Sequence, residues 1–588
     1  MEKKNNYEKR IKVNVLSLLA IIYVMFVVIN DYLCFFLKVN MKPILYIISF
    51  IICILIYIML HKKIQIEKVD FNKFDIVFWI IIMMVFLARL AIPDSAFDTL
   101  NYHIYLQERL FSNNTSYNFF PARWINTFSL PLSDRIHYFF RLILGYKVGL
   151  IANLFVLIIT FYQVKRILNF YIKNDIYISL ISGLIIITEQ LLCNMITYYV
   201  DLMSIPFFLE IITVMLDSKE KNNLTNYYVL LISGVLVSLK ISNAFLLIPI
   251  AIIYILKNRK SINYKTFLIG ILVFVIPFAV YLINNYIQTG NPVFPFYNSI
   301  FKSNYLPFEN WIETYYGPKT ILERLFWPIY VLDYPNRAFD TNTYYGRISF
   351  GYIISLIIIL SIIYRKVVKH DKIKSYEYLS ILYVVLCLVW SNFMMGYIRY
   401  ALILEVLSGI VLALYIYKNI NTKSIFMFIG ALYAIYGFIY TTSASLSDLL
   451  YNTNEISWRK TYYLDEENYN ENKKYLFEKV GYYDEYLKDV DCFGILDYNA
   501  GYAALLSRDI KVIDLNEGYN SEYGKNEFDK VVKSCKSIYT ISTTQTIERT
   551  NKYLLNSNFE RTGDNIVFKV DFINKNNDII IFEIKERE

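Results

Sequence analysis

The sequence has few of the features from which soluble cofactor and nucleotide sites are built. Only six of its 588 residues are cysteine, and no two of them are spaced as Cys-x-x-Cys, which argues against a zinc or thiol redox site. Neither a P-loop nor a Gly-x-Gly-x-x-Gly motif occurs, so nothing indicates nucleotide binding or ATP as an energy source. No internal repeat is visible either, although many secondary transporters are built from repeats.

Apolar residues dominate instead. Hydrophobic residues make up 56% of the sequence and aromatic residues 18%. Runs of about twenty apolar residues recur, and in hydrocarbon such runs must be helical because their backbone groups have no water to bond. We therefore expect a polytopic α-helical membrane protein. The formal net charge of +9 does not indicate a nucleic-acid partner, because the basic residues cluster between the apolar runs and so report topology.

The charges that flank the apolar runs predict the direction of each crossing. Most basic loops fall on one side, which is placed inside together with the N-terminus. The stretch 227–256 is too long for one ordinary crossing and is interrupted by Lys240, so it is interpreted as a hairpin. We expect about thirteen transmembrane helices, near residues 13–30, 43–60, 74–92, 147–164, 176–193, 198–216, 227–239, 242–256, 266–286, 350–364, 376–390, 400–417 and 424–440.

This topology divides the chain into six parts and leaves three large segments outside. Strand-like pieces alternate with helix-like stretches near the C-terminus, which predicts a small extracytoplasmic α/β domain. Its Cys492 and Cys535 would pair in an oxidising compartment, but the sequence leaves unpaired thiols equally open. The parts are the tail with the first three helices (1–92), a first outer loop with an acidic motif (93–146), further helices (147–286), a second outer loop (287–349), the last helices (350–441) and the soluble domain (442–588).

The most informative motif begins where the third apolar run ends, as Asp94-Ser-Ala-Phe-Asp98-Thr-Leu-Asn-Tyr102-His103. In a helix that opens at Phe97, the Asp98 carboxylate and the Tyr102 phenol would share a face. Asp98 is the strongest candidate for a catalytic acid or base, although it could also cap that helix. Asp94 is interpreted either as a turn residue at the interface or as a second acid. His103 is either a ligand or an interfacial polar ring.

Three further charged residues lie near outer helix ends. Asp201 could approach the first outer loop, or it could simply be a cap. Lys240 and Arg399 are cations suited to a phosphate or pyrophosphate head group. The alternative for both cations is that they snorkel to the membrane interface. The stretch 289–297 contains a glycine and two prolines among aromatic residues and is interpreted as a rigid turn.

Taken together, these elements resemble the GT-C superfamily of integral-membrane glycosyltransferases. The resemblance rests on Asp98-x-x-x-Tyr102-His103, Tyr199-Val-Asp201, Lys240, the turn Thr289-Gly-Asn-Pro-Val-Phe-Pro295 and Arg399-Tyr400, and it covers residues 74–440. It is strongest to the branch of the protein O-mannosyltransferases and lipid A aminoarabinose transferases. In that branch the acidic loop usually follows the first helix, whereas two extra helices precede it here.

The resemblance implies a plasma-membrane enzyme that takes a sugar from a polyprenyl-phosphate donor and transfers it to a glycan, lipid or protein acceptor. Asp98 would deprotonate or orient the acceptor, with help from Asp94 or Asp201. Lys240 and Arg399 would bind the departing phosphate, and Tyr102 and His103 would contact the substrate. The partners would be the donor, the acceptor and membrane lipid. Some relatives use a divalent cation, but the isolated aspartates do not demand one.

Two other functions remain open at this stage. A polymerase or ligase of lipid-linked oligosaccharides would also use a polyprenyl-linked donor and outer-face cations. A transporter or flippase would place charged residues along a path through the middle of the membrane. The polar residues of this sequence gather on one face instead.

Overall fold

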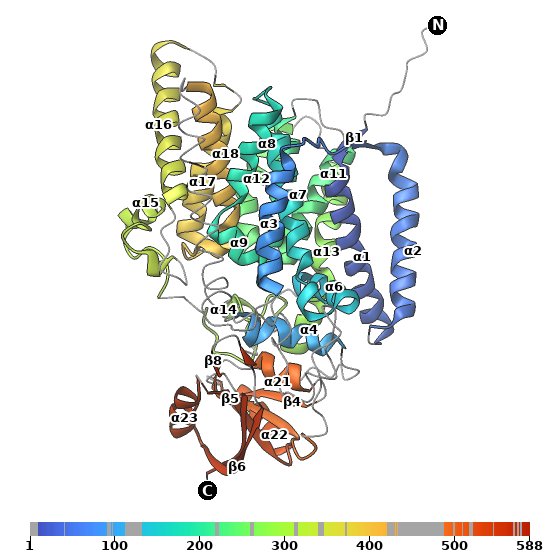
Figure 1. Cartoon of the computed structure of the whole chain (residues 1–588). Coiled ribbons are helices and arrows are strands. Elements are labelled where there is room, and N and C mark those ends of the chain that lie inside the picture. Colours follow the sequence, from blue (N-terminus) through green and yellow to red (C-terminus); the bar gives the residue numbers. More distant parts are fainter. Residues whose placement is uncertain are drawn as a thin grey trace.

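The computed structural model describes most of the helical region and most of the C-terminal part. The described residues are 10–39, 41–90, 96, 98–111, 132–217, 223–258, 264–310, 315–338, 346–370, 373–374, 376–419, 430, 432, 487–497, 500–507, 510–516, 521–544, 546–568, 571–572, 575–576 and 579–587. A bundle of helices occupies the upper part of Figure 1, and the C-terminal domain lies below it.

The long helices of the bundle run approximately side by side (Figure 1). Short helices gather at its lower end, among them the π-helix η2 (Thr99–His103), α4 (Ile104–Phe111) and α6 (Leu132–Val148). The other helices of the bundle include α1 (Val15–Leu37), α2 (Pro43–Leu60), α3 (Asp75–Leu90), α7 (Ile151–Asn169), α8 (Asp175–Ile186), α9 (Glu189–Met195), α10 (Ile205–Leu216), α11 (Asn223–Leu239), α12 (Asn243–Asn258), α13 (Tyr264–Thr289), α16 (Gly346–Val368), α17 (Glu377–Phe393) and α18 (Leu402–Asn419).

Six of the described helices are long and apolar enough to cross a membrane, and a seventh span results if the bent pair α8 and α9 is counted as one. Helices α3, α11, α12 and α17 are apolar but shorter. The multi-pass helical architecture is therefore confirmed, whereas the count of thirteen crossings stays a prediction. The last predicted helix, at 424–440, falls almost entirely outside the described residues.

Two predicted helices differ from the structure in an informative way. The run predicted at 176–193 is broken at Ile187 and Thr188, and its two halves meet at 72°. Thr188 caps the second half, because its hydroxyl accepts a hydrogen bond from the Leu191 amide at 3.2 Å. The run predicted at 198–216 becomes helical only at Ile205, and the 3₁₀ turn η3 (Asp201–Ser204) precedes it. At both breaks, backbone groups and polar side chains lie inside an apolar bundle.

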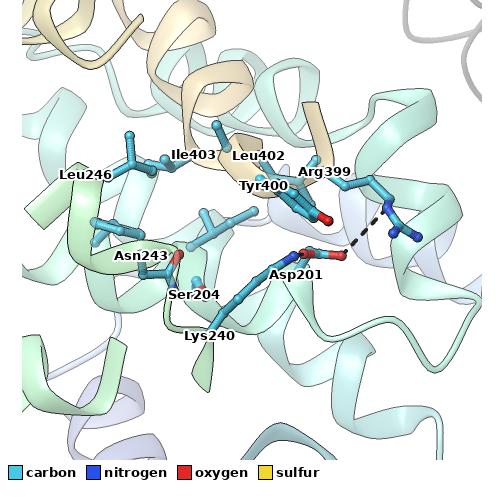
Figure 2. A pocket seen from close by; sticks show the side chains of 12 residues that line it. Asp201, Ser204, Lys240, Asn243, Leu246, Arg399, Tyr400, Leu402 and Ile403 are labelled. Carbon is cyan, nitrogen blue, oxygen red and sulfur yellow. Dashed lines mark hydrogen bonds and ion pairs between the residues drawn. The ribbon is translucent and has the colours of Figure 1, made fainter. Parts of the chain in front are cut away.

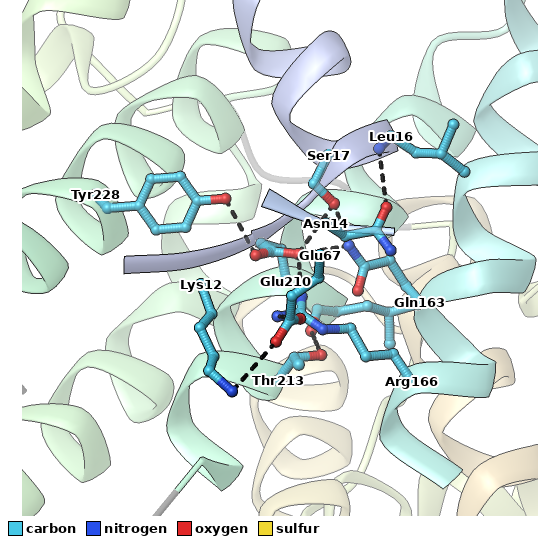
Figure 3. Close-up of polar contacts among 11 residues, drawn as sticks. Lys12, Asn14, Leu16, Ser17, Glu67, Gln163, Arg166, Glu210, Thr213 and Tyr228 are labelled. Carbon is cyan, nitrogen blue, oxygen red and sulfur yellow. Dashed lines mark hydrogen bonds and ion pairs between the residues drawn. The ribbon is translucent and has the colours of Figure 1, made fainter. Parts of the chain in front are cut away.

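A buried polar network ties four helices together (Figure 3) close to β1, which Figure 1 shows at the end of the bundle that carries the N-terminus. Glu210 of α10 is 1% exposed and accepts hydrogen bonds from Ser17 Oγ at 3.0 Å and Tyr228 OH at 3.1 Å. Arg166 of α7 binds Glu210 at 3.0 Å and Glu67 of β2 at 2.8 Å. Strand β2 (Ile64–Glu67) pairs in parallel with β1 (Ile11–Asn14). The network therefore joins α1, α7, α10 and α11 to this small sheet.

The C-terminal domain is built on a five-stranded sheet in the order β4-β3-β5-β9-β6. Strand β3 (Cys492–Ile495) is parallel to β4 (Lys511–Asp514) and β5 (Ile538–Thr543), whereas β9 (Ile579–Glu586) is antiparallel to β5 and β6 (Phe559–Phe568). Each of the five strands overlaps one strand-like piece of the sequence, at 492–497, 510–514, 537–541, 566–570 and 579–583, of which 569–570 lie outside the described residues. A short pair, β7 (Asp571–Phe572) with β8 (Lys575–Asn576), and the helices α21 (Ala500–Leu506), α22 (Glu522–Lys533) and α23 (Ile547–Asn556) complete the domain. Cys492 and Cys535 form a disulfide, with their Cα atoms 5.9 Å apart.

The C-terminal domain packs against described parts of both loops that are predicted to lie outside, 93–146 and 287–349, and these two ranges are named the first and second outer loop after that prediction. Helix α21 lies on η2 and α4, and a Cβ atom at Gly501 would come within 2.7 Å of the Leu100 carbonyl oxygen. Only glycine allows this close approach of two backbones. On the other side of the domain, Phe294 from the second outer loop is 1% exposed and belongs to the apolar cluster of the sheet. The domain therefore contacts the turn that follows Asp98.

We predict that Glu210→Ala strongly destabilises the fold, because it leaves the Arg166 guanidinium without its buried partner. Breaking a buried ion pair from one side typically costs about 3–5 kcal/mol. The measurement is the thermal unfolding midpoint of the purified protein in detergent. Lys12→Ala is the matched control, because the Lys12–Glu67 pair is 37% and 32% exposed and such a pair is worth about 0–1 kcal/mol. Equal midpoints for the two variants would refute a structural role of the network.

Candidate active site

The turn that follows Asp98 is a π-helix rather than an α-helix. The amide of Ile104 donates to the carbonyl oxygen of Thr99, five residues earlier. This wider turn brings position i+5 over position i, so Asp98 and His103 lie on the same side of η2. The Asp98 side chain makes no capping hydrogen bond. The interpretation of Asp98 as a helix cap is therefore wrong, and its carboxylate is directed elsewhere.

Asp98 forms an ion pair with Arg399, whose Nη2 atom lies 2.5 Å from Asp98 Oδ2. Arg399 belongs to the 3₁₀ turn η6 (Ile398–Ala401), which precedes α18. Its Nε atom is also 4.0 Å from Oδ2 of Asp201, and Asp201 Oδ1 binds Lys240 Nζ. Four charged side chains from four separate segments thus form one cluster, and Figure 2 shows three of them.

Aromatic rings hold the two cations of this cluster. The Lys240 Nζ atom lies 3.7 Å from the centre of the Tyr400 ring. The Arg399 guanidinium carbon lies 4.2 Å from the centre of the Tyr199 ring and 5.4 Å from that of Tyr397. Cation–π contacts of this kind stabilise a partly desolvated charge. With exposures of 22% and 12%, the Lys240 and Arg399 side chains do not extend freely into solvent.

The cluster lies at one side of a small pocket (Figure 2). Its polar wall includes Asp201, Lys240 and Arg399, and its apolar wall consists of Ile205, Phe208, Leu246, Leu402 and Ile403. The pocket therefore offers two cations next to an aliphatic surface. This combination suits a ligand with an anionic head and an apolar tail.

Local structure explains how Lys240 reaches the pocket. Helix α11 ends at Leu239 and α12 begins at Asn243, so Lys240 lies in the short turn between two helices. The Asn243 side-chain amide donates to the carbonyl oxygen of Leu236 at 2.8 Å and to Ser204 Oγ at 2.7 Å. These bonds tie the turn to η3, which carries Asp201. The helix break predicted at Lys240 is present.

The charged residues of the cluster shift each other's pKa values. Burial by itself raises the pKa of Asp98, but Arg399, His103 and Lys240 together outweigh it and hold the pKa of Asp98 below its ordinary value. Burial lowers the pKa of Lys240, and Asp201 offsets part of this effect. Asp98 is therefore ionised at neutral pH and paired with a permanent cation.

His103 has a carboxylate partner that the sequence did not reveal. Its Nδ1 atom lies 2.9 Å from Oδ1 of Asp134, near the start of α6. The ring of His103 lies 4.3 Å from that of Tyr102, centre to centre. The sequence gives no sign of this partner, because a separation of 31 residues matches no local motif. Tyr199 and Tyr400 belong to the motifs named above, but their contacts with the two cations were not predicted, since the chain contains 55 tyrosines.

The structure brings most of the candidate residues together. Asp98, Asp201, Lys240 and Arg399 form the cluster, while Tyr102 and His103 share the turn of Asp98. Asp94 lies outside the described residues. Within the described part of the chain, one group of three side chains has metal-ligand geometry, Asp491 with Cys492 and Cys535. Those cysteines form the disulfide and so are not available as thiolate ligands.

Comparison with known proteins gives one family match and two structural matches. A family described as a domain of unknown function (DUF8201) matches residues 138–406, an interval that contains Asp201, Lys240 and Arg399. No curated protein sequence matches the chain. The crystal structure of ArnT from Cupriavidus metallidurans in the apo state is similar over 86% of this chain and 97% of its own, with 9% identity and a TM-score of 0.38.

The same ArnT bound to undecaprenyl phosphate matches with equal coverage, 10% identity and a TM-score of 0.39. ArnT is a lipid A aminoarabinose transferase, which belongs to the branch of the GT-C superfamily that the sequence motifs resemble. A likeness this distant carries no argument about substrate or mechanism, which depend on the residues of this chain.

Proposed function

We propose that this protein is a membrane glycosyltransferase that takes a sugar from a polyprenyl-phosphate donor and transfers it to a cell-envelope acceptor. One observation carries the proposal: two cations and two carboxylates converge beside an apolar pocket at one end of a helical bundle. The motif resemblance described above points to the same activity. The cations fit the phosphate, the apolar wall fits the first isoprene units, and the carboxylates fit the acceptor.

In the proposed donor complex, Arg399 and Lys240 bind the phosphate. A guanidinium binds phosphate through two parallel hydrogen bonds, and an ammonium acts as a point charge. Because both cations are already paired with aspartates, the phosphate has to replace a carboxylate on at least one of them. Arg399 is the better candidate for this exchange, since it contacts both Asp98 and Asp201.

The proposed reaction is a single displacement at the anomeric carbon. The acceptor hydroxyl or amine attacks this carbon, and the bond to the phosphate oxygen breaks with its electron pair leaving on the phosphate. Asp98 orients the acceptor and draws its proton away, while Asp201 holds Lys240 in place. Asp94 stays a candidate for a second acid, and Tyr102 lies on the acceptor side. A single displacement inverts the configuration of the sugar.

The proposed topology places the cluster and the C-terminal domain outside the cell and the N-terminus inside, with thirteen crossings. Helix α21 of this domain contacts η2, the turn that follows Asp98, and the domain lies at the end of the bundle opposite the N-terminus (Figure 1). Helix α18 runs from η6 toward the other end, so reaching the C-terminal domain requires one more crossing, which supports the predicted helix at 424–440. A disulfide in the domain fits an oxidising outer compartment.

Asp98→Asn is expected to reduce sugar transfer by roughly a hundredfold to ten-thousandfold, because an amide cannot take up the acceptor's proton. The measurement is transfer from a polyprenyl-phosphate sugar by the purified protein, together with its thermal midpoint. We expect smaller losses for Asp201→Asn and Asp94→Asn. The matched control is Glu323→Gln, because Glu323 pairs with Arg337 at the same 2.5 Å distance but lies outside the pocket. Near-normal sugar transfer by Asp98→Asn would show that this loop is not part of the active site.

Lys240→Ala and Arg399→Ala are each expected to weaken donor binding at least tenfold. Hydrogen bonds to charged groups contribute about 1.5–3 kcal/mol, and 1.4 kcal/mol corresponds to a tenfold change. Titration with a polyprenyl phosphate measures the affinity directly. Arg337→Ala serves as the control, since it removes an ion-paired arginine of a different loop. If donor affinity stays unchanged in both pocket variants, the two cations are interfacial residues and not phosphate ligands.

The topology is tested with reporter fusions. Alkaline phosphatase fused after residue 588 should be active, because the enzyme folds only on the outer side, and the same reporter fused after Lys369 should be inactive. A cytoplasmic reporter at these two positions should give the reverse pattern. An inactive C-terminal phosphatase fusion together with an active cytoplasmic reporter would contradict an odd number of crossings.

A further inference from the structure

The His103 side chain is held by a carboxylate in a nearly closed environment. Its Nδ1 atom and Asp134 Oδ1 are 2.9 Å apart, and both side chains are 5% exposed. Asp134 Oδ1 also accepts a hydrogen bond from Gln107 Nε2 at 3.1 Å. Gln107 in turn accepts from Arg141 Nη1 at 3.0 Å, and Arg141 pairs with Glu108. This chain of donors fixes the orientation of the Asp134 carboxylate.

The arrangement determines which nitrogen of His103 is able to accept a proton. A carboxylate that receives a donor from Gln107 favours a protonated Nδ1 on the other side. The neutral imidazole then carries its lone pair on Nε2. The π turn places His103 about one turn after Asp98, and the Asp98 carboxylate is one of the charges that act on this imidazole, so both groups belong to one site.

The Asp98 carboxylate by itself is a weak base and does not retain a proton well. It is ionised and paired with Arg399, and its pKa lies below its ordinary value. The charged and titratable groups around His103 are Asp134 and His137 from α6, Asp98 on its own turn and Asp201 from η3. Burial lowers the pKa of His103, but Asp134 first and then Asp98 and Asp201 raise it above its ordinary value. The proton is therefore more stable on the imidazole of His103 than on the carboxylate of Asp98.

We propose that His103 and Asp134 are the pair that takes up the acceptor's proton during transfer, with Asp134 as a positioning residue. The inference rests on the proposed function. The acceptor forms its bond to the anomeric carbon, and the bond from that carbon to the phosphate oxygen breaks with the electron pair. The proton moves from the acceptor through Asp98 to Nε2 of His103. Asp134 stabilises the imidazolium and keeps Nε2 as the accepting atom.

The test is the pH dependence of kcat for sugar transfer in the full-length protein. Because the pKa of His103 lies above its ordinary value, the wild type should be most active above neutral pH and should lose activity as the pH falls and His103 takes up a proton before the reaction. Asp134→Asn removes the charge that raises the His103 pKa, so this acid limb should move to lower pH and the plateau should fall on the order of a hundredfold. Donor affinity should stay within about twofold, since Lys240 and Arg399 are unchanged.

His103→Gln separates this role from a purely structural one. Its amide still donates to Asp134, so a structural bond between η2 and α6 would survive together with the activity. The proposal instead expects loss of transfer, loss of the acid limb and normal donor binding. An acid limb that stays in place in Asp134→Asn, or near-normal kcat in His103→Gln, would overturn the inference. Neither result would contradict the proposed function. The proposed function fails only if the wild type transfers no sugar from a polyprenyl-phosphate donor.

Discussion

The ion pair between Asp98 and Arg399 is the contact on which the rest of the site depends. It joins residues 301 positions apart in the sequence, so it fixes the turn before α18 against the first outer loop. Neither charge is tolerated alone in such a closed place, because a partly buried charge without a partner is strongly destabilising. Arg399 then reaches Asp201, and Asp201 holds Lys240. Each of these residues lies where a helix begins or ends, which is where an apolar bundle is able to expose polar groups.

The C-terminal domain also restricts the position of the loop that carries Asp98. Its helix α21 meets η2 through Gly501, and its apolar cluster includes Phe294 from the second outer loop. A domain attached only by a linker would leave Asp98 free to shift with its loop. Here the turn after Asp98 is packed between the domain and α6, which carries Asp134. The C-terminal domain is thus part of the scaffold of the candidate site.

Much of the site was predictable because an isolated charge in an apolar sequence is conspicuous. Asp98, Asp201, Lys240 and Arg399 stand out for this reason, and the strands of the C-terminal sheet follow from their alternation and turns. The parts of the site that were not predicted have no comparable signal in the sequence. The π turn at 99–103 and the break at Ile187 depend on tertiary packing that no local pattern encodes. Asp134 looks like one polar position of an amphipathic helix until its partner His103 is placed beside it.

Charge balance links these features to the proposed reaction. The cluster contains two cations and two carboxylates, so it is close to neutral without a ligand. A donor phosphate that binds Arg399 weakens its ion pair with Asp98, and the added negative charge raises the proton affinity of that carboxylate. Asp98 would then become able to activate an acceptor only once a donor is bound. In the proposed mechanism, the interaction that stabilises the empty site therefore also determines the order in which the substrates are used.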